Sequence, residues 1–383
     1  NDLNGNGIPD DPLEWDTKDI SGNELAGGDG IPDNYFFVTN PAALEDALTT
    51  VFDTILERVA SGTAASVVAN EQKGTGAVFQ ALYDPVVTDT ADNEVRWVGT
   101  LQGIFVDAAG FLREDGDGDA ILDDYNTDPA IDIFFDDTLD EPRARLRRYT
   151  SSEATEFVES GFTDTELTAL DSLWNARQAL SALSEVTTHR GDRTNLNAVN
   201  TTSAGTGRQI WTWLDADFDG VVDTGEQVPF DSVTFDHTNA GWLDIEGNLA
   251  LNPDADTDVD NLVDYIRGDQ VTGLRNRIVD YDGDGTLETI RLGDIVHSTP
   301  TPAAVPAEAY DLLALDLSYF EYRNQYRNRR QVVYIGANDG MIHAFNGGFF
   351  EEINDAGEVK FGFTEDGPDG ATSHPLGSEL WAD

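Results

Sequence analysis

The chain has 383 residues, of which 73 are acidic and 22 are basic, so its formal net charge is −51. This charge argues against nucleic acids and anionic membranes as partners, because their phosphates would be repelled. Hydrophobic residues make up 39% of the chain, which is enough to form cores and argues against disorder. Cysteine is absent, which excludes disulfides, thiolate metal sites and a thiol nucleophile.

Residues 1–34 are rich in polar turns and begin with a candidate calcium loop. Oxygen ligands can come from alternate positions of this loop, with Gly7 at the turn: Asp2, Asn4, Asn6, the carbonyl of Ile8, and Asp10. Leu13 stands where an EF-hand loop has its closing Glu, so the pattern resembles a thrombospondin type 3 loop instead. Asn40 and Pro41 then predict the start of an amphipathic helix that runs to about Ser61.

Residues 65–112 predict strands, because Val78–Tyr83 and Val95–Val106 are rich in β-branched and aromatic residues. A second calcium-type loop follows, and its candidate ligands are Asp115, Asp117, Asp119, the carbonyl of Ile121, and Asp123. Residues 131–160 are expected to pair short strands around a basic cluster that neutralises neighbouring carboxylates. A capping box at Thr163–Glu166 predicts a helix over 163–184.

The most complete calcium pattern follows the predicted strand Ile210–Leu214. It has the ligand spacing of an EF-hand loop, with Gly220 at the turn: Asp215, Asp217, Asp219, the carbonyl of Val221, Asp223 and Glu226. Residues 230–235 are expected to form a strand after it. The flanking strands favour a calcium site within a β-rich fold over the helix–loop–helix of a calcium sensor.

Two further acidic segments keep the first half of the same pattern. The candidate ligands of the first are Asp256, Asp258, Asp260, the carbonyl of Leu262, and Asp264. The candidate ligands of the second are Asp280, Asp282, Asp284, the carbonyl of Thr286, and Glu288. Clustered carboxylates repel one another strongly at low dielectric, so we expect several Ca²⁺ ions to order these loops.

Four motifs in the last third of the chain carry a family resemblance. They are Tyr265–Gln270, Leu274–Arg277, Leu292–Pro300 and Val332–Asn346, the last of which reads VVYIGANDGMIHAFN. In this order they resemble the PilC/PilY family of type IV pilus tip-associated proteins. Residues 30–36, the Asn40–Pro41 helix and Trp97–Leu101 resemble earlier parts of that family.

The resemblance implies a mainly β fold with a few helices (α+β), in which a β-rich domain with calcium loops leads into a quinoprotein-like β-propeller. We expect residues 1–62 to be the end of a von Willebrand factor A-like domain, 63–300 the β-rich middle region, and 301–383 the start of the propeller. The propeller is incomplete, because a full one needs several four-stranded blades. The chain begins without Met in an Asp/Asn/Gly motif and has no signal peptide or long apolar run, so we expect an internal piece of an exported precursor.

Residues at the end of the chain predict local structure rather than catalysis. Val332–Ile335 and Met341–Phe345 predict a hairpin with its turn at Asn338–Gly340. His343 is expected to be packed or hydrogen-bonded. His297 and Ser298 have no evident third partner and no GxSxG elbow around them, so we interpret them as structural.

The family resemblance implies a non-enzymatic surface protein at the pilus tip, active in adhesion, pilus assembly and calcium-tuned extension and retraction. Expected partners are pilin or minor pilin subunits and host or surface ligands. One alternative is a calcium-stabilised subunit of an extracellular filament that self-associates through edge strands. Another is a quinoprotein-like dehydrogenase, for which the sequence shows no quinone-site constellation.

Overall fold

The computed structural model describes the following residues: 64–68, 75–136, 143–149, 162–190, 206–215, 219–235, 256–306, 308, 310–313, 315–355, 357–367 and 374–383. All of them belong to one compact unit, Arg58–Asp383. The other unit, Asn1–Glu57, and the rest of the helix predicted over 40–61 lie outside the described residues. The predicted calcium loop at residues 2–10 therefore stays a prediction.

The fold is mainly β with few helices, as the sequence predicts. Its larger sheet has eight strands in the order β1-β2-β3-β4-β6-β7-β8, with β9 also paired to β3. Their bounds are β1 Ala64–Val68, β2 Gly76–Thr88, β3 Glu94–Val106, β4 Leu112–Arg113, β6 Ala130–Asp136, β7 Arg143–Tyr149, β8 Phe162–Glu166 and β9 Trp174–Asn175. The strands predicted within 78–83 and 95–106 are confirmed as the long antiparallel pair β2–β3.

A second sheet has six strands in the order β16-β17-β18-β19-β5, with β20 also paired to β18. Their bounds are β5 Ile121–Leu122, β16 Thr301–Ala303, β17 Gln331–Gly336, β18 Ile342–Asp355, β19 Glu358–Thr364 and β20 Glu379–Ala382. The predicted hairpin is confirmed as β17–β18, with Gly340 at a φ of +89° in its turn. The described strands form open sheets, and the β-propeller stays a prediction.

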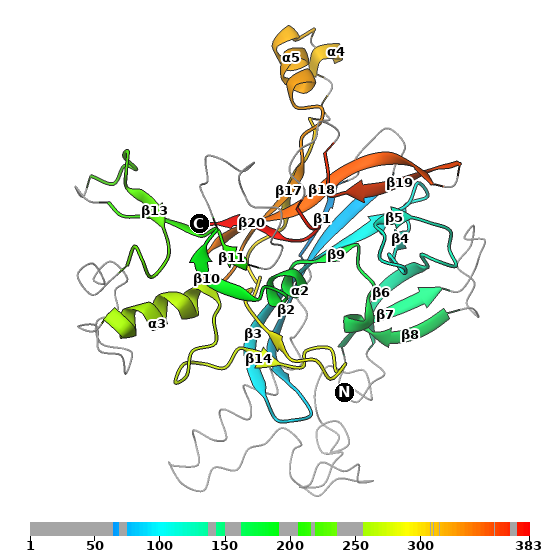
Figure 1. Cartoon of the computed structure of the whole chain (residues 1–383). Helices are drawn as coiled ribbons and strands as arrows, with labels where there is room; N and C mark the ends of the chain where they lie inside the picture. Colours follow the sequence, from blue (N-terminus) through cyan, green and yellow to red (C-terminus); the bar gives the residue numbers. More distant parts are fainter. Residues whose placement is uncertain are drawn as a thin grey trace, which may run out of the picture. The chain divides into compact units, whose positions relative to one another are not determined.

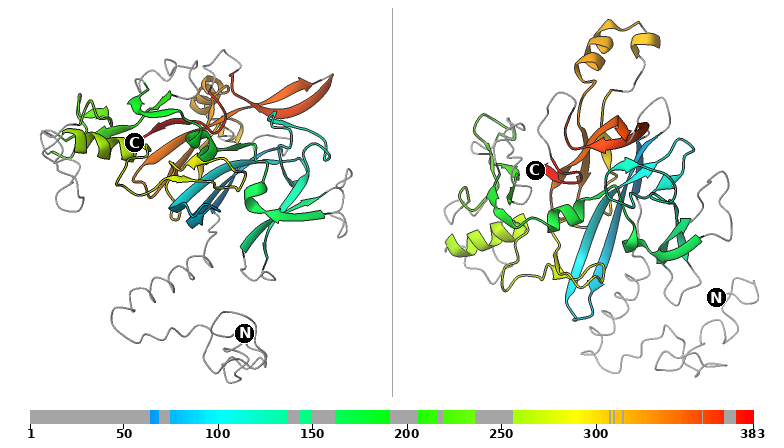
Figure 2. Two further views of the ribbon diagram at one scale, coloured as in Figure 1. Left: turned by 60° about the horizontal axis from the view of Figure 1, so that its bottom comes forward. Right: turned by 45° about the vertical axis from the view of Figure 1, so that its right-hand side comes forward.

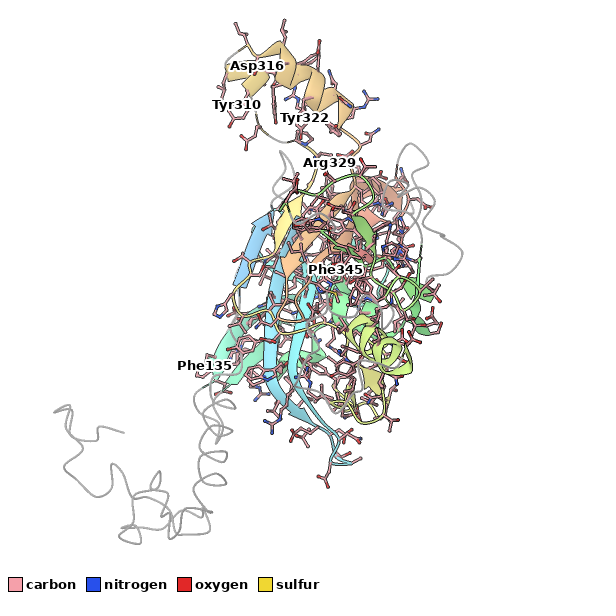
Figure 3. All side chains as sticks on the ribbon, turned by 90° about the vertical axis from the view of Figure 1, so that its left-hand side faces the viewer. Phe135, Tyr310, Asp316, Tyr322, Arg329 and Phe345 are labelled. Carbon is pink, nitrogen blue, oxygen red and sulfur yellow. The ribbon has the colours of Figure 1, made fainter. Side chains whose placement is uncertain are left out.

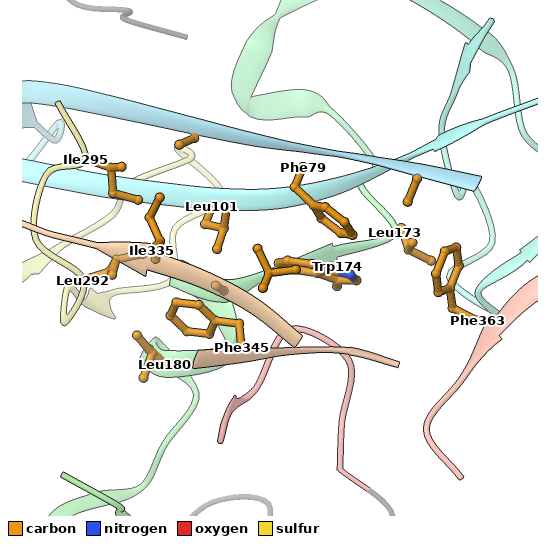
Figure 4. Close-up of a cluster of buried hydrophobic side chains, with 14 of the residues drawn as sticks. Phe79, Leu101, Leu173, Trp174, Leu180, Leu292, Ile295, Ile335, Phe345 and Phe363 are labelled. Carbon is orange, nitrogen blue, oxygen red and sulfur yellow. The ribbon is translucent and has the colours of Figure 1, made fainter. Parts of the chain in front are cut away.

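The main hydrophobic core lies between these two sheets (Figure 4). Phe79 and Leu101 come from β2 and β3, and Ile335 and Phe345 come from β17 and β18. Trp174 lies among them and stacks on Phe79, with 5.4 Å between the ring centroids. This core joins the middle region to the C-terminal hairpin, so the expected boundary near residue 300 does not separate two cores.

The helix predicted over 163–184 is wrong over most of its length. Phe162–Glu166 is strand β8, followed by the 3₁₀ helix η2 Leu167–Ala169 and by β9, and only Ala176–Ser181 is helical, as α2. The side chain of Asn175 caps α2 by accepting from the backbone of Arg177 and Gln178. Asp164 instead accepts two hydrogen bonds from Arg147 of β7, at 2.7 and 2.8 Å, which fixes β8 to its neighbour.

The basic cluster in β7 neutralises carboxylates, as predicted. Arg147 pairs with Asp164, and Arg148 pairs with the buried Glu114. The predicted pairing of short strands within 131–160 is confirmed by β6 and β7.

Three two-stranded sheets lie beside the larger ones. Their strands are β10 Glu185–His189 with β11 Thr206–Arg208, β12 Trp211–Trp213 with β13 Gln227–Pro229, and β14 Ile278–Val279 with β15 Glu288–Thr289. The strand expected over 230–235 is wrong, because a turn at 231–234 follows β13. Phe230 and Phe235 are instead buried against α3, Asp256–Arg267, which both views of Figure 2 show beside β10–β13.

Two short helices, α4 Tyr310–Leu313 and α5 Leu317–Gln325, stand apart from the sheets between β16 and β17 (Figures 1 and 3). Neither contains a buried residue, and Leu313 is 84% exposed. No helix within the described ranges has the length and hydropathy needed to cross a membrane.

His343 is packed and hydrogen-bonded, as predicted. It is fully buried in β18, with Nδ1 2.8 Å from Glu379 Oε1 and Nε2 3.1 Å from Asp339 Oδ2. Glu379 also accepts two hydrogen bonds from the buried Arg208, at 2.6 and 2.8 Å. Four charged groups therefore satisfy one another inside the protein, as buried charges require.

Candidate metal centres

Three of the predicted calcium loops share one local conformation. In each, the carboxylate at position 1 accepts a hydrogen bond from the backbone N–H at position 6, as in the pairs Asp115–Ala120 (3.1 Å), Asp215–Gly220 (3.0 Å) and Asp280–Gly285 (3.0 Å). The residue at position 6 has a φ of +60°, +77° or +88°, respectively. The carboxylate at position 5 accepts from the N–H at position 7 in all three, at 2.6–2.8 Å.

This geometry wraps the backbone of each loop around the first carboxylate. Glycine takes a positive φ without strain, which explains its presence at position 6 in two of the loops. Ala120 adopts the same conformation despite its Cβ, so the departure from glycine in the 115–123 loop does not prevent the turn.

The loop that starts at Asp115 gathers the largest set of carboxylates among the described residues. Oxygens of Asp115, Asp117 and Asp128 lie within 4.8 Å of one another, and so do oxygens of Asp117, Asp119 and Asp123. Calcium–oxygen distances are about 2.3–2.6 Å, so two ligands of one ion are separated by at most about 5 Å. Both groups of three therefore fit the spacing of a Ca²⁺ shell.

Asp115, at the first position of the loop, is a buried member of this cluster. The residue is 5% exposed, and while its Oδ2 accepts from Ala120, its buried Oδ1 has no hydrogen-bond partner in the structure. Burial, and after it the charges of Asp128, Asp119 and Asp117, raise the pKa of Asp115 to about 7. A buried carboxylate that has an unpartnered oxygen and other carboxylates around it is in the kind of environment where a cation would compensate the negative charges.

Asp128 is a candidate ligand that the sequence pattern misses. It is fully buried, and its two carboxylate oxygens accept from the backbone of Gly116 at 2.9 Å and of Asp123 at 2.6 Å. Position 12 of the motif is occupied by Asn126, and Asp128 lies two residues beyond it. A turn in which the N–H of Asp128 donates to the carbonyl of Asp124 brings this carboxylate back to the loop.

The same loop connects the two large sheets. The strand before it, β4, belongs to the eight-stranded sheet, and β5, which lies within the second half of the loop, belongs to the six-stranded sheet. Asp115 N donates to the carbonyl of Asp171 at 2.9 Å, and Phe363 N of β19 donates to the carbonyl of Ala120 at 2.9 Å. Ordering of this loop therefore acts on both sheets at once.

Lys360 provides a fixed positive charge at the edge of the cluster. Its Nζ lies 2.5 Å from Asp123 Oδ1 and 2.5 Å from Asp355 Oδ2. Hydrogen bonds to these two carboxylates raise the pKa of Lys360 above its usual range. Asp123 is thus already paired with a cation, whereas Asp115, Asp117 and Asp128 form no ion pair with any residue that the structure describes.

The 215–226 loop lies within the β12–β13 hairpin, in which Trp213 pairs with Gln227. Glu226, at position 12, is buried, and its Oε2 accepts from Asp223 N at 2.9 Å and from the indole of Trp213 at 3.3 Å. Asp217 lies outside the described residues, so the full ligand set stays a prediction. The preceding strand is confirmed, and the loop is flanked by strands rather than by the helices of an EF-hand.

The 280–288 loop also collects three carboxylates, since oxygens of Asp280, Asp282 and Asp284 lie within 4.8 Å of one another. Glu288 lies in β15 and forms an ion pair with the buried Arg177. Its carboxylate is therefore held by a guanidinium, which leaves the three aspartates and the Thr286 carbonyl as candidate protein ligands.

The calcium loop predicted over 256–264 is wrong in its conformation, because this segment forms the first turns of α3. Successive residues of a helix are rotated by about 100°, so the alternate positions 256, 258 and 260 do not lie on one face of α3. The Leu262 carbonyl and Asp264 also lie within this helix. The apolar residues Val259 and Val263 are buried in the core with Phe230 and Phe235, and this packing selects the helix.

Comparison with known proteins finds partial matches to curated relatives. The chain is 36% identical over 119 residues to the type IV pilus biogenesis factor PilY1 of Pseudomonas aeruginosa (strain UCBPP-PA14), which is 27% of this chain and 9% of that protein. It is 34% identical over 94 residues to a PilY1 homolog of Xylella fastidiosa, which is 24% of this chain and 7% of that protein. No protein-family model and no solved structure matches. Both partial matches are to PilY1-type proteins, the family that the ordered motifs of the last third resemble, and they support a PilY1-type type IV pilus protein.

Proposed function

We propose that the chain is a calcium-binding surface protein of a type IV pilus system, which acts at the pilus tip in adhesion, assembly and calcium-tuned extension and retraction. The pilus assignment is supported by the two relatives, both named as type IV pilus biogenesis factors. In this proposal the protein works by binding and assembly, not by catalysis. Its location is extracellular, and its partners are pilin or minor pilin subunits together with host or surface ligands.

The calcium assignment is carried by the unpartnered, buried oxygen of Asp115 in its cluster with Asp117 and Asp128. Two buried carboxylates so close together are costly unless a cation or a proton compensates them. Ca²⁺ suits the site because it takes six to eight oxygen ligands in flexible geometry, and backbone carbonyls and water can complete the shell. Calcium in extracellular fluids is abundant enough to fill sites with a Kd of about 10⁻⁴–10⁻³ M.

Calcium would act on the fold through this loop, which follows β4 and contains β5. Occupied, the loop holds its ends in the two sheets at fixed positions. Without the ion, repulsion among Asp115, Asp117 and Asp128 loosens that connection. Calcium thereby controls the rigidity of the surface formed by both sheets, which is the physical basis that we propose for calcium tuning.

Calorimetric titration with Ca²⁺ and thermal melts with Ca²⁺ or with EGTA test this proposal. We expect saturable binding and a higher Tm in Ca²⁺, because a ligand at a hundred times its Kd stabilises the folded state by about 2.7 kcal/mol. Mg²⁺ serves as the control, since it prefers octahedral geometry and is dehydrated reluctantly. Absence of calcium binding together with an unchanged Tm in EGTA would contradict the calcium assignment.

The pilus assignment is tested separately with sheared and purified pili. Immunogold electron microscopy is expected to place the protein at one end of the filaments. Uniform labelling along the filament would instead indicate a structural subunit, and absence from the pilus fraction would contradict both roles.

A further inference from the structure

A cavity of about 460 Å³ lies where segments far apart in the sequence meet. Its walls come from Val95–Trp97 of β3, Tyr265 and Ile266 of α3, residues 275–277, residues 290–294, and the β17–β18 turn at residues 338–339. Its volume falls within the range of about 300–1,000 Å³ that is usual for ligand pockets. No candidate calcium ligand lines it.

The backbone around this cavity is closely packed. Gly99 N donates to the carbonyl of Leu292 at 3.1 Å, Val98 forms a β-bridge with Gly293, and Gly293 N donates to Asp339 Oδ2 at 3.1 Å. A Cβ added to Gly99 would lie 1.9 Å from the carbonyl oxygen of Gly293. Such close approach fixes three of the walls relative to one another, so the cavity has a defined shape before any ligand enters.

The charge inside the cavity is opposite to that of the chain. Three of the 22 basic residues line it, namely Arg96, Arg275 and Arg277. The two carboxylates that line it already have partners. Asp294 accepts from the side chain of Asn338 at 2.6 Å, and Asp339 lies 3.1 Å from the His343 ring.

Arg275 is an arginine of the cavity that has no partner among the described residues. It is exposed and forms neither an ion pair nor a hydrogen bond with any described residue, in a chain with more than three acidic residues for each basic one. Arg277 beside it donates to the carbonyls of Ile290 at 3.2 Å and Tyr265 at 3.0 Å, but its buried Nε has no partner in the structure. Burial, and after it the charge of the neighbouring Arg275, lower the pKa of Arg277.

The rim of the cavity carries a strained aromatic residue. Trp97 has a φ of +61°, a conformation that is unfavourable for a bulky side chain, and its side chain is 39% exposed although it lies within β3. Backbone strain of this kind is concentrated at functional sites. Tyr265 lies on the opposite wall, with the Arg277 guanidinium 4.1 Å from its ring centroid.

From these observations we infer that the cavity binds a carboxylate carried on an aromatic or aliphatic body. The carboxylate pairs with Arg275, because a planar guanidinium can donate two parallel hydrogen bonds to the two carboxylate oxygens. The apolar body packs on the exposed ring of Trp97. The carboxylate comes either from a free small acid or from a segment of a partner polypeptide. The inference is independent of calcium binding and of the pilus role, because it rests on none of the acidic loops.

Binding of two probe pairs to the full chain in calcium-containing buffer tests this inference. N-acetyl-L-phenylalanine represents a free acid, and the capped dipeptide acetyl-Phe-Asp-amide represents a side-chain carboxylate in a polypeptide. Their uncharged counterparts are N-acetyl-L-phenylalanine amide and acetyl-Phe-Asn-amide. We expect saturable binding of at least one acid by ligand-observed NMR, with its amide at least about tenfold weaker. The acid that binds more tightly indicates the source of the natural ligand.

The variant Arg275→Gln is expected to weaken binding of that acid about tenfold, whereas Arg327→Gln, at an exposed arginine outside the cavity, leaves it unchanged. A melting temperature for each variant establishes that it is folded. If Arg275→Gln fails to fold, the variant Trp97→Ala is measured in its place, and it is also expected to weaken binding of the acid. Failure of both acids to bind at millimolar concentration, equal binding of acid and amide, or equal affinity of the cavity variant and the control would overturn the inference.

Discussion

Asp115 and Asp128 are thirteen residues apart in the chain, yet both are buried and their carboxylate oxygens lie within 4.8 Å of each other. Among the described residues, neither is paired with an arginine or lysine. Asp128 is held by two backbone N–H groups, while one oxygen of Asp115 has no partner. The pair therefore forms the buried side of the candidate cation site, and the exposed Asp117 lies on its outer side.

Asp117→Asn tests this site with the least disturbance of the fold, because Asp117 is exposed and accepts none of the hydrogen bonds that shape the loop. We expect the variant to bind calcium about tenfold more weakly at one site and to keep the parent's Tm in EGTA. Isothermal calorimetry and a melt in EGTA measure the two quantities. The matched control is Asp92→Asn, in the exposed β2–β3 turn at a φ of +61° that asparagine tolerates. Equal calcium affinity in Asp117→Asn and in this control would rule out the site.

Glu226→Gln is expected to lower calcium affinity at the 215–226 loop, because glutamine cannot supply a bidentate, charged ligand. Its amide still reaches the positions near Asp223 N and the Trp213 indole where Glu226 accepts hydrogen bonds. Fluorescence of Trp213 reports on this loop directly. A parent protein whose Trp213 emission does not respond to calcium, measured against a Trp213→Phe variant, would exclude binding there.

The His343 network predicts that stability falls in alkaline solution. Burial disfavours the charged imidazole, but Asp339 and Glu379 outweigh it and raise the pKa of His343 from 6.5 to about 9. Both ring nitrogens face carboxylates, so both carry protons. A pKa that is higher in the folded state contributes stability that is complete below pH 6.5 and is lost as the pH rises through 9. The full change is on the order of 3 kcal/mol.

Urea unfolding at several pH values between 6 and 9.5 measures this loss. His343→Gln is expected to reduce the pH dependence, while His297→Gln, at an exposed histidine, keeps that of the parent. A parent protein equally stable at pH 6.5 and 9.5 would show that His343 is neutral in the folded state.

Gly99→Ala is expected to destabilise the protein by about 3 kcal/mol, because the new Cβ would lie 1.9 Å from the carbonyl oxygen of Gly293 and neither backbone is free to move. The control is Gly336→Ala in β17, where the nearest atoms to a Cβ are 3.7 Å away and φ is not positive. The free energy of unfolding of that variant is expected to differ from that of the parent by no more than about 1 kcal/mol. The free energies of unfolding of both variants are measured in urea. Equal values for Gly99→Ala and Gly336→Ala would show that the contact between β3 and residues 292–293 is loose.

The sequence by itself determined the elements whose signals are local. The β-branched and aromatic residues of β2 and β3 predict strands, and the Asn-Asp-Gly turn between β17 and β18 predicts a hairpin, because strand propensity and turn chemistry act over a few residues. The same holds for the acidic loops, in which an aspartate and an N–H five residues later close the turn.

The tertiary structure decided what depends on distant partners. Asp256–Asp264 has the spacing of a calcium loop but folds as a helix, because Val259 and Val263 are buried against Phe230 and Phe235. Residues 163–166 read as a helix cap but form a strand, because Arg147 holds Asp164. Asp128 joins the metal cluster, and Arg275 and Trp97 share a cavity, only through contacts between segments far apart in the chain. Spacing along one segment carries no information on such contacts, since burial and pairing are set by the residues that the fold brings to that segment.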